Sequence, residues 1–420
     1  MEETLDNSKT TTCCIVGGGP AGMVLGYLLA RAGVAVTVLE KHKDFFRDFR
    51  GDTIHPSTLE LMYELGLLDE FLKLPHQQLT SVGGQYGDFS FTAADFSHLP
   101  THCKFVALMP QWDFLNFLAE KANQFPIFDL RMEHEAIGVI EENDRVTGVR
   151  VKTREGVVEI GADLVVGCDG RHSTVRDAVG LEVMDLGAPI DVLWFRISRR
   201  AGDSTQVLGR LNYGKALILI NREEYFQAGL IIPKGSYEQL KAEGLLAFRA
   251  SLRQLAPFLG ERVEEVKDWE QIKILSVQIN RLRRWHRPGL LCIGDAAHAM
   301  SPAGGVGINL AIQDAVAAAN ILAGPLCENR VTEAVLTGVQ QRREFPTRVI
   351  QSMQVNIHAA MAKVLGHPAS VKAPWQMRLV LSIPGRKRLL ARALGLGIRP
   401  EHVKAPYQTS APRPQPVSRQ

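Results

Sequence analysis

Residues 13–40 read CCIVGGGPAGMVLGYLLARAGVAVTVLE, and this stretch decides the fold. The apolar run at 13–16 predicts a short buried strand. The segment 21–33 has the composition of a helix and is closed by Gly33, and 34–40 is again typical of a buried strand. A strand, a helix and a second strand at this spacing predict a βαβ unit, and with it a parallel sheet.

The turn between the first strand and the helix carries the glycine pattern of a dinucleotide site. Gly17, Gly19 and Gly22 fit G-x-G-x-x-G: the first permits a tight turn, the second lets the backbone approach a pyrophosphate, and the third lets helix and strand pack closely. The helix N-terminus offers unpaired N–H groups to phosphates, and Glu40 ends the second strand, where an acid accepts from ribose hydroxyls. The residues predicted to bind the cofactor here are Gly17, Gly19, Pro20, Ala21, Gly22, Glu40 and Lys41.

Composition narrows the class of protein. A chain of 420 residues is long enough for two domains, and a formal net charge of +3 does not suggest a nucleic-acid partner. The six cysteines form no C-x-x-C pair, so we expect no metal site and no flavin disulfide reductase. The run 10–30 has no charge, but it follows an acidic start and is broken by glycines, so we expect no signal peptide and no integral membrane span. We expect a cytoplasmic protein.

The predicted secondary structure changes along the chain. Short strands dominate from about 191 to 279, whereas 290–295 and 306–322 return to a buried strand followed by a helix of small residues. Ser57 and Thr58 are expected as N-caps of a helix that starts there, and 80–108 is typical of a hairpin. We predict an α/β fold in which a Rossmann-like domain of residues 1–79, 106–190 and 287–355 is interrupted by a β-sheet-rich substrate domain of residues 80–105 and 191–286. C-terminal helices with a disordered basic tail are expected at 356–420.

Two further segments specify the cofactor. LVVGCDGRHSTVR lies at 164–176, and LCIGDAAH lies at 291–298. They resemble the DG and GD motifs of group A flavoprotein monooxygenases, the family typified by para-hydroxybenzoate hydroxylase, and the resemblance covers about 12–323. It implies FAD as cofactor, with Asp295 on the ribityl chain and Asp169 with Arg171 serving both FAD and the pyridine nucleotide. NADH or NADPH is the implied reductant, and Arg171 and Arg176 are its expected docking residues.

The segment 302–309 extends the expected cofactor site. It leads into a helix whose first N–H groups would face the pyrimidine edge of a flavin and favour its anionic reduced form. Gln111 stands where relatives often have arginine, and Val306 where the family often has glutamine, so this chain lacks that charge and that side chain. Arg50 resembles a family arginine that contacts FAD. The further residues assigned to the cofactor are Arg50, Gln111, Gly305, Val306, Gly307, Ile308 and Asn309, and those assigned to catalysis are Arg50, Pro302 and Gly304.

The resemblance implies a monooxygenase that uses FAD, NAD(P)H and O2 to hydroxylate or epoxidise an aromatic or polyketide-like small molecule through a C4a-hydroperoxyflavin. An FAD-dependent reductase or dehydrogenase of the same fold, and a flavin-loaded binding protein without turnover, stay open as alternatives. A flavin-dependent halogenase is disfavoured because the W-x-W-x-I-P segment is absent. No general base is assigned: His55, His172 and His298 each have a structural interpretation, and we expect His298 to bond backbone.

Candidate substrate contacts lie on the strands of the insert, where an interpretation as ordinary core stays open. They are Trp194, Arg196, Tyr213, Tyr225 and Phe226. The segment 376–420 is basic, with Glu401 as its single acid, and from Pro406 it is rich in proline and expected to be disordered. We expect a solvated helix packed on the domain, with peripheral contact to an acidic membrane surface or to a partner as the alternative.

Overall fold

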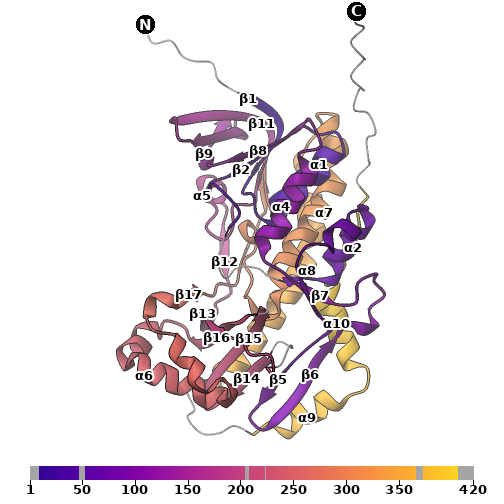
Figure 1. The fold of residues 1–420 in the computed structure, drawn as a ribbon. Helices are drawn as coiled ribbons and strands as arrows, with labels where there is room; N and C mark the ends of the chain where they lie inside the picture. The colour runs from indigo at the N-terminus through magenta and orange to yellow at the C-terminus, as the bar shows by residue number, and fades with distance from the viewer. Residues whose placement is uncertain (1–8, 47–52, 204–207, 223, 366–371, 405–420) are drawn as a thin grey trace, which may run out of the picture.

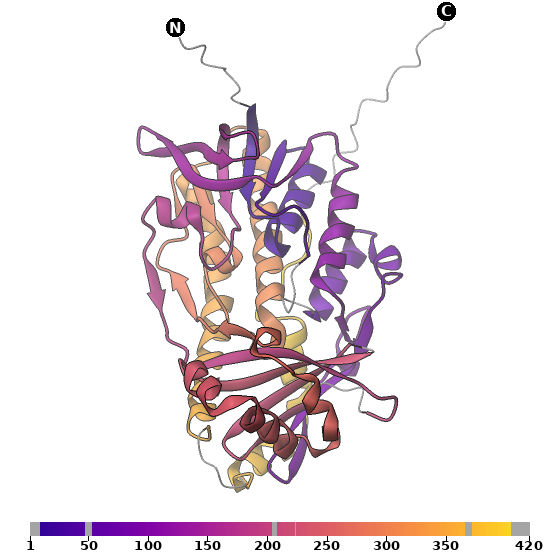
Figure 2. The same cartoon turned by 60° about the vertical axis from the view of Figure 1, so that its left-hand side comes forward.

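The computed structural model describes residues 9–46, 53–203, 208–222, 224–365 and 372–404 (Figure 1). They form an α/β protein with two main sheets, which confirms the predicted fold class. In both views one sheet lies with the helices near the N-terminal strand and the other lies at the opposite end, with two long helices running between them (Figure 2).

The first sheet grows from the predicted βαβ unit. Its strands in spatial order are β19 (His286–Arg287), β20 (Leu290–Cys292), β11 (Val157–Gly167), β1 (Lys9–Val16), β2 (Val36–Glu40) and β8 (Phe128–Met132), with β10 (Arg145–Lys152) paired to β11 and β9 (Glu135–Glu142) paired to β10. The five strands from β20 to β8 are mutually parallel. Cys13, Cys14 and Ile15 are fully buried, as expected for a strand covered on both faces.

Several helices pack together on one side of this sheet (Figure 1). α1 packs against both α7 and α4, and α7 packs against α8. The helices of this half are α1 (Pro20–Arg31), α2 (Pro56–Glu64), α3 (Leu68–Phe71), α4 (Gln111–Ala122), α5 (Thr174–Ala178), α7 (Val306–Cys327) and α8 (Glu333–Ala362). α7 is long and apolar enough to cross a membrane, but 78% of its most apolar window is buried inside the protein, as in the core helix of a domain.

The second sheet is built mainly from the strand-rich middle of the chain. Its strands in spatial order are β17 (Lys273–Ser276), β13 (Ile190–Ser198), β16 (Tyr225–Pro233), β15 (Lys215–Arg222), β14 (Leu208–Asn212), β5 (Ser81–Tyr86) and β6 (Phe89–Asp95). The hairpin β5–β6 joins it because β5 pairs in parallel with β14. Residues from two distant parts of the chain therefore share one sheet.

Each face of the second sheet has its own cover. α6 (Tyr237–Leu255) packs on the face that carries Phe195 and Phe226. The other face carries Trp194 and meets the end of α8. Of two C-terminal helices, α10 (Arg386–Gly395) packs along β6, and α9 (Trp375–Ser382) lies near the turn between β5 and β6 (Figure 1).

Short elements complete the described chain. The small strands are β3 (Thr53–Ile54), β4 (Gln77–Leu79), β7 (Val106–Leu108), β12 (Val183–Asp185) and β18 (Asn280–Leu282), and the 3₁₀ turns are η1 (Phe96–His98), η2 (Pro257–Glu265), η3 (Trp269–Gln271), η4 (Gly294–Ala296) and η5 (Ala303–Gly305).

The start of α2 corrects one expectation. The N-cap is His55 rather than Ser57 or Thr58, because Pro56 occupies the first helical position, where its missing N–H costs nothing. The two hydroxyls instead donate to Oδ1 of Asn309 on α7, at 2.5 Å from Ser57 and 3.2 Å from Thr58. They bind α2 to the first turns of α7.

Candidate functional site

The predicted motifs meet at one edge of the first sheet. β1, β2, β11 and β20 are parallel, so their carboxyl ends lie on the same side. The glycine turn follows β1, Glu40 ends β2, and the DG and GD segments follow β11 and β20. Ligands of open α/β sheets bind outside such strand ends, so this edge is the candidate site.

The glycine turn is tight on one side and open on the other. Gly17 has φ +106°, and a Cβ there would lie 2.5 Å from the carbonyl oxygen of Cys168. A Cβ on Gly22 would lie 2.0 Å from the oxygen of Gly17, which only glycine avoids. At Gly19 a Cβ would meet nothing within 4 Å. The backbone at the N-terminus of α1 is thus accessible where a pyrophosphate would approach it.

Glu40 lies beneath this turn. Its carboxylate accepts hydrogen bonds from the backbone N–H of Gly18 at 3.2 Å and of His42 at 3.0 Å. Glu40 is buried, whereas its neighbour Lys41 is exposed. The acid therefore holds the end of β2 against the glycine turn, in the place predicted for a ribose ligand.

The DG and GD segments contact each other through Arg171 and Asp295. One guanidinium nitrogen of Arg171 lies 3.4 Å from Oδ2 of Asp295. Both side chains are partly exposed, at 26% and 32%. A partly open carboxylate beside an arginine at the sheet edge offers an acceptor for sugar hydroxyls and a donor for phosphate.

The side chains of Asp169 and Arg176 form hydrogen bonds with the backbone inside the same region. Oδ2 of Asp169 accepts from the N–H groups of Thr174 at 2.7 Å and Val175 at 3.4 Å, which fixes the start of α5. Oδ1 is buried with no partner among the described residues, and burial raises the pKa of this carboxyl above its ordinary value. The buried guanidinium of Arg176 donates to the carbonyl oxygens of Arg171 and Ala296. These bonds place Arg176, one of the two residues expected near the pyridine nucleotide, between the two motifs.

The start of α7 closes the site. Gly304 and Gly305 have φ of +81° and +63°, and a Cβ on Gly305 would lie 2.4 Å from Oγ1 of Thr53. Gly305 is the N-cap of α7, and its N–H donates to the oxygen of Pro302 at 3.0 Å. The first N–H groups of α7, at Val306 and the residues after it, precede any intrahelical partner and carry the positive end of the helix dipole.

Other residues assigned from the sequence are placed as follows. Gln111 begins α4, and Asn309 directs its side-chain oxygen to α2. His55 is buried, with Nδ1 2.8 Å from the carbonyl oxygen of Leu394, while His172 is exposed. Arg50 lies outside the described residues.

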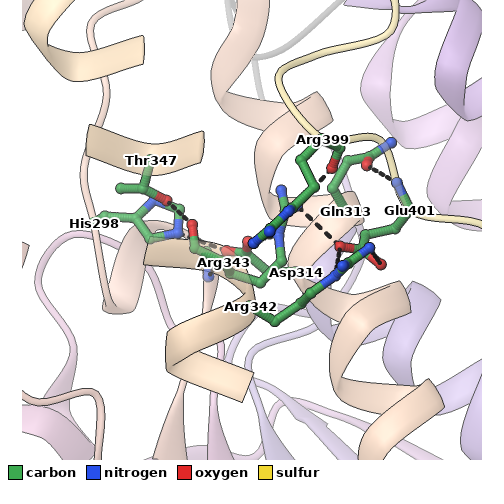
Figure 3. A network of polar contacts seen from close by, with 9 residues as sticks. His298, Gln313, Asp314, Arg342, Arg343, Thr347, Arg399 and Glu401 are labelled. Atoms are coloured by element: carbon green, nitrogen blue, oxygen red, sulfur yellow. Dashed lines mark hydrogen bonds and ion pairs between the residues drawn. The ribbon is translucent and has the colours of Figure 1, made fainter. Parts of the chain in front are cut away.

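A buried network of charged side chains connects the GD segment, residues 291–298, to α7 and α8 (Figure 3). Oδ2 of Asp314 on α7 accepts from the N–H of Gly294 at 3.1 Å and lies 2.5 Å from Nε2 of His298. Oδ1 of Asp314 accepts from Nε of Arg343 at 2.9 Å, and Arg343 also reaches Glu401. Burial alone would raise the pKa of Asp314, but His298 and Arg343 lower it below its ordinary value. The expectation that His298 bonds backbone is therefore wrong: its Nε2 bonds a carboxylate.

The network continues as a polar stripe along α8. Gln354 donates to the carbonyl oxygens of Ser301 at 3.0 Å and Ala303 at 3.2 Å, and accepts from the N–H of Ser301 at 3.0 Å. Nε2 of His358 lies 2.9 Å from Oγ of Ser301, which also accepts from the N–H of Ala303. Burial lowers the pKa of His358.

This stripe comprises residues that sequence reasoning missed. Its members, spaced three or four apart and buried, are Arg343, Thr347, Gln351, Gln354 and His358. The sequence does show these polar residues at helical spacing. The same spacing is typical of a solvent-exposed helix face, so it did not identify them as buried. Here the stripe holds the loop that joins the GD motif to α7.

The candidate substrate residues lie on different faces and ends of the second sheet. The ring of Phe226 packs on Phe258, inside the core under α6, so the structure corrects its assignment to a substrate pocket. Trp194 lies on the opposite face, and Arg196, two positions along the strand, shares that face. The guanidinium of Arg196 lies 5.0 Å from the ring centroid of Tyr225.

Tyr213 is remote from this pair. It occupies the turn between β14 and β15 with φ +49°, whereas Tyr225 pairs with Arg222 at the far end of β15. Eight residues of β15 separate the two tyrosines by about 25 Å at the rise of a strand. One small ligand would not contact both.

The chain is similar to flavin-dependent enzymes in sequence. The model of a family described as FAD binding domain matches residues 9–353. A 6-methylpretetramide 4-monooxygenase of Streptomyces rimosus is 30% identical over 388 residues, which cover 91% of each chain. A rifampicin monooxygenase of Streptomyces venezuelae is 28% identical over 308 residues, which cover 72% of this chain and 61% of that protein.

Solved structures show the same fold. A crystal structure of a probable FAD-dependent monooxygenase from Pseudomonas aeruginosa superposes with a TM-score of 0.72 at 21% identity, covering 85% of this chain and 98% of that one. An anhydrotetracycline hydroxylase from Streptomyces rimosus superposes with a TM-score of 0.73 at 22% identity, covering 93% and 77%.

Proposed function

The chain belongs to the FAD binding domain family as an FAD-dependent monooxygenase of the group A type, and we propose that NADH or NADPH is its reductant and an aromatic, polyketide-like small molecule its substrate. The substrate class is proposed from the relative that acts, by its name, on 6-methylpretetramide. The supporting observation in the structure is the contact between Arg171 and Asp295 beside the open glycine turn.

The residues at the sheet edge fit FAD. The turn 17–22 and the start of α1 would hold the pyrophosphate, Glu40 the adenosine ribose, and Asp295 the ribityl hydroxyls. The first turn of α7 would hold the pyrimidine edge of the flavin, where N–H groups stabilise negative charge. When bound, FAD supplies the hydride acceptance and oxygen activation that side chains lack, and the protein supplies position, charge and exclusion of water.

The pyridine nucleotide would dock transiently beside Arg171. The sequence has no second glycine pattern between a strand and a helix, so no separate nicotinamide domain is expected. Arg171 is partly exposed and adjoins Asp295, whereas Arg176 is buried. A phosphate of NAD(P)H would find its charged donor at Arg171.

The substrate would lie against the Trp194 face of the second sheet. Nε1 of Trp194 is buried and has no acceptor among the described residues, so a carbonyl or phenol oxygen of a ligand would complete its bonding. Arg196 and Tyr225 add a charged and a hydroxyl donor near the end of the same face.

Reduction kinetics test the proposed reductant and its docking residue. We expect NAD(P)H oxidation by the purified protein to be slow alone and to rise when an aromatic or polyketide compound binds. Arg171→Ala should slow reduction by NAD(P)H about tenfold or more, the loss of one charged contact, and leave photoreduction intact. Arg283→Ala, in an exposed ion pair with Glu182, is the matched control. Equal loss of both reduction routes would remove Arg171 from the nucleotide site.

A further inference from the structure

The C-terminal hairpin, residues 375–395, exposes large apolar side chains. Trp375, Leu379, Ile383 and Leu389 are 70%, 59%, 51% and 71% exposed. Single exposed apolar residues are ordinary, but four from one helical hairpin make a surface feature that needs a partner. Trp375 and Leu379 are one turn apart on α9, and Ile383 follows in the turn to α10.

The inner side of the hairpin is fixed to the second sheet. The guanidinium of Arg378 lies 3.4 Å from a carboxylate oxygen of Asp88 and 5.1 Å from the ring centroid of Phe89. Arg386 donates to the carbonyl oxygen of Thr92 at 3.2 Å, and Ala391 is fully buried. These contacts fix α9 and α10 to the sheet by their inner side, whereas the four exposed apolar side chains lie on the solvent side.

Exposed basic residues lie on α10 beside the exposed apolar side chains of the hairpin. Lys387, Arg388 and Arg392 are exposed on α10, on the same hairpin as Leu389. Residues 372–404 hold eight lysines and arginines against the single acid Glu401, although the whole chain has a formal charge of only +3. Apolar side chains that include a tryptophan, bordered by basic residues, are the pattern of a surface that lies in the headgroup region of an anionic bilayer.

We propose that the C-terminal hairpin docks the protein on anionic lipid membranes, with Trp375, Leu379, Ile383 and Leu389 entering the interface and Lys387, Arg388 and Arg392 facing lipid headgroups. A second copy of this chain fits less well, because a two-fold contact through this surface would bring the same basic residues together. The docking surface is independent of the proposed substrate and reductant.

Vesicle sedimentation tests the proposal on the full-length protein. We expect binding to vesicles with about a third phosphatidylglycerol in phosphatidylcholine, weakening as salt is added, and little binding to phosphatidylcholine alone. Leu379→Ser with Leu389→Ser should reduce the partition coefficient about tenfold or more, because apolar area no longer enters the interface. Lys387→Glu with Arg388→Glu should abolish the preference for phosphatidylglycerol.

The control is Leu246→Ser, which removes an apolar side chain that is 77% exposed on α6, in another part of the surface. It should leave vesicle binding unchanged. A second measurement, quenching of tryptophan fluorescence by brominated lipid, should be lost in Trp375→Phe even if the serine variants fold poorly. No binding to anionic vesicles, or equal loss in Leu246→Ser, would overturn the proposal. Self-association abolished by the serine variants, without vesicle binding, would assign the surface to a second copy instead.

Discussion

Nε2 of His298 lies 2.5 Å from Oδ2 of Asp314, and both side chains are almost fully buried. The same carboxylate accepts from Arg343 and from the backbone of Gly294, so one aspartate on α7 joins the GD loop to α8. A buried charge with this many partners is costly to alter, because each partner loses its compensation.

We therefore expect Asp314→Asn to lower the free energy of unfolding by about 3 kcal/mol at neutral pH, because it breaks the buried ion pairs with His298 and Arg343 and leaves Arg343 with Glu401 alone. Urea denaturation measures this. His298 and Arg343 lower the pKa of Asp314, so its contribution exists above the ordinary pKa of aspartate and is lost as the pH falls through the lowered value. The difference between variant and wild type should shrink in acid. Glu182→Gln, which breaks the exposed pair with Arg283, should cost less than about 1 kcal/mol.

Substitutions at two glycines of the same turn should affect protein stability and FAD binding separately. Gly19→Val adds a side chain that starts in open space, so we expect unchanged stability and FAD affinity reduced by about tenfold or more, because the new side chain occupies the approach to the backbone. Gly17→Ala puts a Cβ on the oxygen of Cys168 at positive φ and should cost about 2 kcal/mol of stability or more. Fluorescence titration and thermal unfolding measure the two effects. Wild-type FAD affinity in Gly19→Val would remove this turn from the site.

Asp295 should be required for FAD retention. Asp295→Ala removes a charged acceptor, and loss of such a hydrogen bond costs about 1.5–3 kcal/mol, so the dissociation constant of FAD should rise by about tenfold to a hundredfold. Glu182→Ala, which removes an exposed acid paired with Arg283, is the control. If purified Asp295→Ala stayed fully loaded with FAD, its carboxylate would be only a structural partner of Arg171.

His358 should make stability depend on pH. Burial lowers its pKa, so below the ordinary value near 6.5 the unfolded chain binds a proton that the folded protein does not, and stability falls as the pH falls. His358→Gln removes this difference. We expect the loss of unfolding free energy between pH 7.5 and 5 to be smaller in the variant by up to about 2 kcal/mol. An identical pH dependence of denaturation would show that His358 titrates alike in both states.

The sequence correctly predicted the features that depend on the spacing of residues within one segment. The glycine turn, Glu40 and the DG and GD segments each follow a buried strand, so their meeting at one sheet edge follows from parallel pairing. The cap of α2 was predicted wrongly because Pro56 shifts the helix start and Ser57 finds Asn309, 252 residues away. A hydrogen bond between residues so far apart in the chain does not appear in the local pattern of the sequence.

The polar stripe of α8 was missed for a related reason. Gln354 and His358 stand at the spacing of a solvent-exposed helical face, and only the tertiary fold buries that face against the loop at Ser301. The side of the second sheet on which Trp194 and Phe226 lie was equally undetermined. Alternation along a strand separates two faces but does not say which face a helix will cover.

The fate of molecular oxygen tests the central claim, that this chain is a monooxygenase, most directly. The purified protein, loaded with FAD and supplied with NAD(P)H, would be given aromatic and polyketide compounds under isotopically heavy O2, and the products analysed by mass spectrometry. We predict that at least one compound stimulates NAD(P)H consumption. Its product should carry one heavy oxygen atom for each NAD(P)H consumed. NAD(P)H-dependent conversion of a bound compound to a product without heavy oxygen would contradict the account and identify the chain as a reductase.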